Sequence, residues 1–121
     1  MINFVADVEP IPQARPRFSR GRCFEPKRNA EYKKQIAQAA RSAMGELEPM
    51  TCELSAVIKL YRKYKCSSRR FGDWDNLGKA ICDACNKIVY ADDSQIVRCV
   101  VEKFTDKENP RVEVEFSEIG E

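Results

Sequence analysis

A chain of 121 residues with 43% hydrophobic and 33% charged residues has the length and composition of one soluble globular domain, so we expect residues 1–121 to share a single core. No segment approaches the roughly 20 apolar residues that a membrane-spanning helix needs, and the first residues lack the basic start of an export signal, which predicts a cytoplasmic protein with no membrane partner. The formal net charge of +2 is too small to indicate a nucleic-acid partner by itself.

The charges are distributed unevenly along the chain. Residues 58–71 contain six basic and no acidic side chains, and four arginines lie within residues 15–22. Glutamates at the C-terminal end, within residues 113–121, offset part of this charge. The small net charge therefore conceals two basic segments, which we expect to form a basic face suited to a polyanion.

Periodicity in the first half of the chain predicts a strand, a loop and a helix. Apolar and polar residues alternate over residues 2–8, as in a strand with one buried face. Prolines punctuate residues 10–26, which predicts a long irregular loop. Apolar residues then recur at helical spacing over residues 28–47, where Gly45 and Pro49 are plausible stop signals.

The second half is predicted to contain a strand, a second helix and two further strands. The apolar stripe of residues 77–88 predicts an amphipathic helix, which Asp73 or Asp75 can cap. The order β-α-β-α-β-β predicts an α+β fold in which two helices pack against a mixed sheet. The expected strands cover residues 54–60, 96–101 and 112–116, with a turn at 107–110.

The motif Asp73-Trp74-Asp75-Asn76-Leu77-Gly78-Lys79 follows the second basic segment. Asp73 and Asp75 are two residues apart, so their carboxylates project to the same side if the chain is extended there. Lys79 lies one helical turn after Asp75, where its ammonium group can sit beside the acids or a phosphate, and Trp74 is expected to be a packing anchor. Carboxylates would repel a polyanion unless divalent cations neutralised them, so the pattern favours a metal site that acts on phosphate.

A second acidic pair, Asp92 and Asp93, follows the predicted helix. The turn there can bring one of them back toward the sheet edge, and because adjacent residues rarely share a face, we expect only one to bind metal. Asn76 and Asp83 share one side of the helix and are candidates for further ligands or for support around the metal. The plain structural interpretation of the first acidic pair is a helix cap, and that of the second is a turn.

The six cysteines are expected to be reduced thiols, because no export signal directs the chain to an oxidising compartment. Cys82 and Cys85 have Cys-x-x-Cys spacing, but the sequence contains no histidine and its other cysteines are scattered singly. This motif also lies in the middle of a predicted helix. We therefore predict neither a zinc site nor a redox dithiol formed by these two residues.

At these residues the chain resembles the RusA-like Holliday junction resolvases, a family of small homodimeric endodeoxyribonucleases. The resemblance is carried by residues 73–79, by Asp83-Ala84 and by Val89-Tyr90-Ala91-Asp92-Asp93-Ser94-Gln95-Ile96. It extends more loosely to Arg15-Pro16-Arg17 and to Phe24-Glu25-Pro26-Lys27. This compound pattern is far more specific than a single Asp-x-Asp.

The resemblance implies that Asp73, Asp75 and Asp93 bind Mg²⁺, for which Mn²⁺ can substitute, that Lys79 assists at the scissile phosphate, and that Asp92 is a neighbour whose role is open. It also implies a homodimer, since a four-way junction offers two symmetric strands to nick, and it suggests a phage or prophage setting. The resulting hypothesis is a Mg²⁺-dependent, structure-selective endodeoxyribonuclease that resolves four-way DNA junctions in recombination or repair. The residues expected to hold backbone phosphates are Arg15, Arg17, Arg20, Arg22, Lys63, Lys65, Arg69 and Arg70.

Two other functions fit parts of the pattern. A non-catalytic nucleic-acid-binding module would use the acids only to cap a helix, and its binding would be indifferent to Mg²⁺. A phosphatase or nucleotidyltransferase of the Asp-x-Asp kind normally has its first aspartate at the end of an apolar strand, whereas residues 67–70 here are serines and arginines. Hydrolysis of a small phosphate ester, but not of DNA, would favour this third function.

Overall fold

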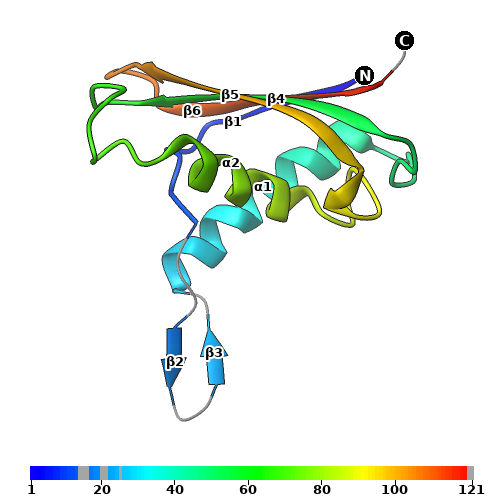
Figure 1. The fold of residues 1–121 in the computed structure, drawn as a ribbon, viewed down its shortest axis with the longest axis horizontal. Coiled ribbons are helices and arrows are strands. Elements are labelled where there is room, and N and C mark those ends of the chain that lie inside the picture. Colours follow the sequence, from blue (N-terminus) through cyan, green and yellow to red (C-terminus); the bar gives the residue numbers. More distant parts are fainter. Residues whose placement is uncertain (14–16, 20–21, 25, 120–121) are drawn as a thin grey trace.

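A four-stranded mixed sheet in the order β1-β6-β4-β5 forms one layer, and the two long helices cover one of its faces (Figure 1). The computed structural model describes residues 1–13, 17–19, 22–24 and 26–119. This architecture confirms the predicted α+β fold and the order of its main elements. The elements are β1 (Ile2–Ala6), β2 (Arg17–Ser19), β3 (Arg22–Phe24), α1 (Lys27–Met44), β4 (Leu54–Arg62), α2 (Trp74–Cys85), the short 3₁₀ helix η1 (Asp93–Gln95), β5 (Ile96–Thr105) and β6 (Arg111–Glu118).

The core lies between the sheet and the helices, as the alternating pattern predicts. The even-numbered residues of β4 from Leu54 to Leu60 and those of β6 from Val112 to Phe116 are almost completely buried against the helices. Burying each large apolar side chain contributes about 1.5–3 kcal/mol, so these two central strands anchor the fold. β6 pairs antiparallel with both β1 and β4, whereas β5 pairs parallel with β4.

Both helices bury one apolar stripe and end before the last apolar residue of the predicted stripe, and α1 ends at Gly45, one of its two predicted stop signals. In α1 the buried residues recur four apart from Tyr32 to Met44, and the helix stops where Gly45 adopts a positive φ of 58°. Leu47, which the prediction placed in the buried stripe, is 62% exposed beyond the helix. α2 ends at Cys85, so Ile88 lies in the turn that follows. Within the described residues, neither helix is long and apolar enough to cross a bilayer.

The predicted irregular loop of residues 10–26 contains an antiparallel hairpin, β2-β3, which projects from the body of the molecule (Figure 1). Its strands are three residues each, too short for an alternating pattern to be recognised in the sequence. The hairpin comes directly before α1.

β5 lies at the edge of the sheet, although its nearly continuous apolar sequence is typical of a strand buried on both faces. Val97 is 52% exposed in this strand. β4 lies between β5 and β6, so the turn at 107–110 joins strands that are not neighbours. Asp106 shapes this connection: it accepts hydrogen bonds from the backbone N–H groups of Glu108 (3.1 Å) and Asn109 (3.0 Å) and from the Arg111 guanidinium (2.9 Å).

Candidate active site at the start of α2

The backbone that leads into α2 is held by two cations from neighbouring strands. Arg62, at the end of β4, donates from Nη1 to the carbonyl oxygens of Arg70 (3.1 Å) and Phe71 (2.8 Å). Lys103, on β5, donates from Nζ to the carbonyl oxygen of Gly72 (2.9 Å). Three successive carbonyl groups are therefore fixed directly before the first candidate aspartate.

Arg62 itself is a buried structural residue, although it belongs to the basic segment that the sequence predicts to face a polyanion. It is only 5% exposed, pairs with Glu9 (Nε to Oε1, 3.3 Å) and lies 4.9 Å from the Tyr64 ring centroid. The backbone beside it also requires a glycine: Gly72 has φ of 100°, and a Cβ there would lie 3.0 Å from Cγ of Pro12. These contacts specify one path for the segment that precedes the site.

Asp73, Asp75 and Lys79 are all exposed at the N-terminal end of α2. Asp73 occupies the N-cap position with extended backbone (φ −76°, ψ 139°), but its side chain makes no capping hydrogen bond. Asp75 lies in the first turn, and no described residue forms an ion pair with any of the three. Capping alone therefore does not explain these carboxylates, and the positive end of the helix dipole favours negative charge there.

Trp74 stands between the two aspartates and is 60% exposed. The interpretation of Trp74 as a packing anchor is wrong, because the first turn of α2 directs this ring away from the core. The residue of this turn that packs in the core is instead Leu77, which is completely buried. A large exposed aromatic ring beside two exposed carboxylates is a surface feature that the sequence pattern did not reveal.

Asn76 and Asp83 join α2 to the segment before the hairpin and to α1. Asn76 Nδ2 donates to the carbonyl oxygen of Gln13 (3.1 Å), and Gln13 Nε2 donates to Asp83 Oδ2 (2.6 Å). Lys33 Nζ of α1 lies 3.8 Å from the same carboxylate oxygen. Through these contacts, Asn76 and Asp83 hold α2 against the segment at Gln13 and against α1.

Asp92 and Asp93 differ in their surroundings, although they are adjacent. Asp92 caps η1: its Oδ2 accepts from the backbone N–H of Ser94 (3.1 Å), and its own N–H donates to Gln95 Oε1 (2.9 Å). Hydrogen bonds from the hydroxyl and then the backbone N–H of Ser94 hold the pKa of Asp92 below its usual value. Gln95 in turn donates to the carbonyl oxygen of Met50 (2.8 Å), which ties η1 to the core. The Asp92 carboxylate is part of this capping box, whereas Asp93 is exposed.

The two acidic pairs lie at opposite ends of α2 (Figure 1). A helix of 12 residues is about 18 Å long, so the carboxylates of Asp73 and Asp75 are far from that of Asp93 in one chain. Among the described residues, no three side chains of His, Cys, Asp or Glu lie together as a metal-binding group. A single copy of the chain therefore does not gather the three predicted ligands around one ion.

The basic residues predicted to hold phosphates fall into two groups. The segment between β4 and α2 presents exposed Lys63, Lys65, Arg69 and Arg70 directly before the candidate aspartates. Arg15 and Arg20 lie outside the described residues, and Arg17 and Arg22 belong to β2 and β3, where only the backbone is described.

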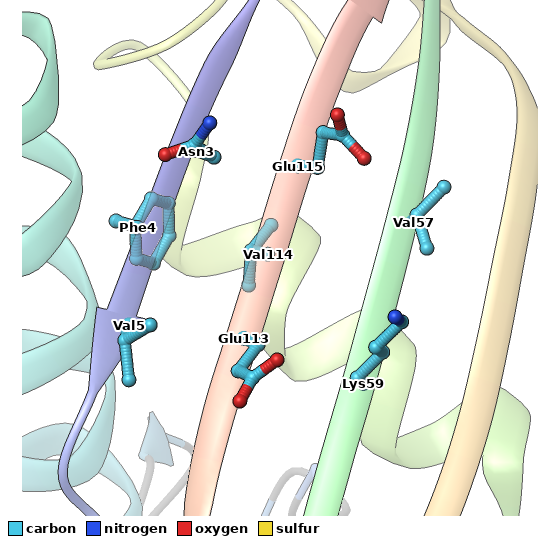
Figure 2. Close-up of a pocket in the computed structure, with 8 residues that line it drawn as sticks. All are labelled: Asn3, Phe4, Val5, Val57, Lys59, Glu113, Val114 and Glu115. Atoms are coloured by element: carbon cyan, nitrogen blue, oxygen red, sulfur yellow. The ribbon is translucent and has the colours of Figure 1, made fainter.

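A separate hollow lies on the outer face of the sheet, away from the helices. It has a volume of about 290 Å³ and is lined by residues of β1, β4 and β6, including Lys59, Glu113 and Glu115 (Figure 2). None of the candidate catalytic residues lines it. Two glutamates would repel a phosphate, so this hollow does not extend the candidate site.

Two comparisons with known proteins show which family this chain belongs to. The model of the family described as endodeoxyribonuclease RusA matches residues 7–117, which include both acidic pairs and Lys79. A relative in Bacillus subtilis (strain 168), the uncharacterized protein YqaN, is 33% identical over an alignment of 140 positions, which covers 98% of this chain and 97% of the relative. The chain therefore belongs to the RusA endodeoxyribonuclease family.

Proposed function

We propose that the protein is a Mg²⁺-dependent, structure-selective endodeoxyribonuclease that resolves four-way DNA junctions in recombination or repair. The observation that carries this proposal is the exposed group of Asp73, Asp75 and Lys79, which has no ion-pair partner among the described residues and directly follows an exposed basic segment, in a chain of this family. Bases that hold the DNA backbone next to acids that hold a cation are the combination that phosphodiester hydrolysis requires.

The donor set at the start of α2 fits Mg²⁺. Mg²⁺ takes oxygen ligands, retains several waters and is commonly bound by one or two carboxylates together with substrate phosphates. Asp73 and Asp75 supply two carboxylates that no described ion pair occupies. When bound, the ion would supply a water of lowered pKa and neutralise charge on the phosphate, and Mn²⁺ is expected to substitute.

The remaining residues have distinct tasks in this proposal. Lys79, one turn after Asp75, stabilises the negative charge that develops on the phosphate oxygens. Lys63, Lys65, Arg69 and the arginines of the hairpin hold the backbone on either side of the cut. Asp92 positions η1 through its cap, so Asp93 is the member of the second pair that we assign to the metal.

A homodimer completes the site. Because Asp93 lies beyond the far end of α2, the Asp93 that joins Asp73 and Asp75 comes from the second copy. A two-fold dimer then has two such shared sites, which suits a substrate with two symmetric strands to nick. In this proposal, cleavage requires dimerisation because α2 is too long for one chain to bring all three carboxylates together.

The test is cleavage of a synthetic four-way junction, with linear duplex and single strands as comparisons and with or without Mg²⁺. The parent protein is expected to cut the junction only when the metal is present, and Asp75→Asn is expected to bind it without cutting. Glu118→Gln, which changes an exposed carboxylate at the end of β6, is the matched control and should cut like the parent. Cleavage by Asp75→Asn at the parental rate would show that the metal assignment is wrong.

The second candidate is a non-catalytic nucleic-acid-binding module. The observation that favours it is the lack of a three-residue metal-binding group among the described residues of one chain. Junction binding that is unchanged by Mg²⁺, with no cleavage at any metal concentration, would support this function.

A further inference from the structure

Two thiols from different elements meet where α2 packs against the edge strand β5. The side chains of Cys82 on α2 and Cys99 on β5 lie close enough for each to shift the pKa of the other, and neither residue is in a disulfide. Cys82 is half-buried, whereas Cys99 is exposed. The pair is therefore in contact and reachable from solvent.

The packing of the helix on the strand fixes this contact. A Cβ on Gly78 would lie 2.9 Å from Cγ2 of Val101, so the absence of a side chain at Gly78 lets α2 approach β5 closely. Cys82 lies about 6 Å further along the helix axis, and Cys99 lies about 6.6 Å back along the strand. Because these two steps nearly match, a helix and a strand that run in opposite directions meet again at the two cysteines.

The two thiols have different chemical characters. The hydrogen bond from Cys82 lowers the pKa of Cys99 to about 7, although partial burial opposes this change. The same bond, followed by burial, raises the pKa of Cys82. Cys99 is thus the thiolate that attacks an oxidant, and Cys82 is the neighbouring thiol that resolves the product.

We propose that Cys82 and Cys99 are a redox modification site, at which hydrogen peroxide closes a reversible disulfide between α2 and β5. Cys99 sulfur attacks a peroxide oxygen, breaks the O–O bond and becomes a sulfenic acid while water leaves. Cys82 sulfur then attacks the Cys99 sulfur, its proton goes to the departing hydroxyl, and a second water leaves. One peroxide is reduced and two thiols are oxidised; a dithiol such as dithiothreitol restores both thiols by exchange.

This pair is distinct from the Cys-x-x-Cys motif within α2. Cys85 is completely buried, and burial raises its pKa to about 12, so it stays protonated and shielded from an oxidant. Cys66 lies elsewhere, where its thiol donates to the carbonyl oxygen of Lys103 (3.3 Å). Cys82 is three residues beyond Lys79, so the disulfide would pin the half of α2 that follows the candidate site.

The experiment treats the reduced, full-length protein with hydrogen peroxide at one equivalent, alkylates the remaining thiols and maps them by mass spectrometry. We expect loss of two thiols, a peptide cross-link between residues 82 and 99, and full reversal by dithiothreitol. Cys66→Ser and Cys85→Ser are matched controls that should keep the cross-link, whereas Cys82→Ser should leave Cys99 as a sulfenic acid that a dimedone probe captures. No cross-link in the folded parent, or one that joins other cysteines, would overturn the proposal. Because the readout is a covalent bond, its failure is independent of any result on DNA cleavage.

Discussion

The adjacent residues Asp92 and Asp93 make different contacts, because only the Asp92 carboxylate accepts a hydrogen bond from the backbone of η1. The Asp92 carboxylate caps η1, while the Asp93 carboxylate is exposed. We expect Asp93→Asn to abolish junction cleavage without changing the melting temperature. Asp92→Ala should lower the melting temperature, and Asp92→Ser, which retains a capping oxygen, should restore it. If Asp93→Asn cleaves at the parental rate, Asp93 is not a ligand.

The cap also makes a prediction about pH. The pKa of Asp92 is lower in the folded state than its ordinary value of about 3.9, so the stability that it contributes is fully present above pH 4. This contribution is lost as pH falls through the lowered folded-state pKa. The melting-temperature difference between the parent and Asp92→Ala should therefore be constant from pH 7 to about 5 and shrink below about 4. A difference that persists unchanged at lower pH would show that the charge of Asp92 is not involved.

Trp74 provides a direct optical probe of the candidate site, since it is the one tryptophan of the chain and is 60% exposed. We expect its fluorescence to change when a four-way junction binds in EDTA, because DNA covering the site removes water from the indole ring. A linear duplex at the same concentration should cause a smaller change. Saturating junction that shifts the protein in a gel but leaves the emission unaltered would place DNA away from the start of α2.

At the scale of elements, the path of the segment between β4 and α2 depends on hydrogen bonds from the buried guanidinium of Arg62. Replacing Arg62 with Met removes two carbonyl hydrogen bonds and leaves Glu9 unpaired. We expect the free energy of unfolding in urea to fall by about 2–4 kcal/mol. Arg69→Met, in the same segment but exposed, should change it by less than about 0.5 kcal/mol and should weaken DNA binding instead. Equal effects of the two variants on stability would contradict this division.

Periodicity predicted the elements with one clear buried face, but it missed the β2-β3 hairpin and the edge position of β5. β4, β6 and both helices bury regular stripes, so their positions follow from the spacing of apolar residues. The β2-β3 hairpin has strands too short for a period, and β5 is apolar yet lies at an edge. The edge position of β5 and the burial of Arg62 both depend on the order of the strands in the sheet. That order is set by contacts between residues far apart in the sequence, which periodicity does not report.

The sequence predicted which residues are candidates for the site, but not how they are arranged in space. Asp73 and Asp75 lie at the helix start, as the capping pattern indicates. The separation of Asp93 from them was also implicit in the sequence, because the predicted helix of more than ten residues lies between the two pairs. The sequence pattern does not reveal whether a second copy brings the distant carboxylate close, since surfaces between copies leave no period in the chain.

At the scale of the whole molecule, the proposed function makes dimerisation a requirement for catalysis, because α2 separates Asp93 from the first acidic pair, and mixing two inactive variants tests this. Asp75→Asn and Asp93→Asn should each be inactive as homodimers. If each site combines the start of α2 from one copy with Asp93 of the other, a mixed dimer has one site with both substitutions and one site with neither. Refolding the two variants together in equal amounts should therefore restore about a quarter of the parental active sites, seen as nicking of one strand at a junction. Asp73→Asn mixed with Asp75→Asn is the matched control: both substitutions lie at the same end of α2, so no intact site forms. A site contained within one chain would give no recovery in either mixture, because every site in the mixed dimer would carry one substitution.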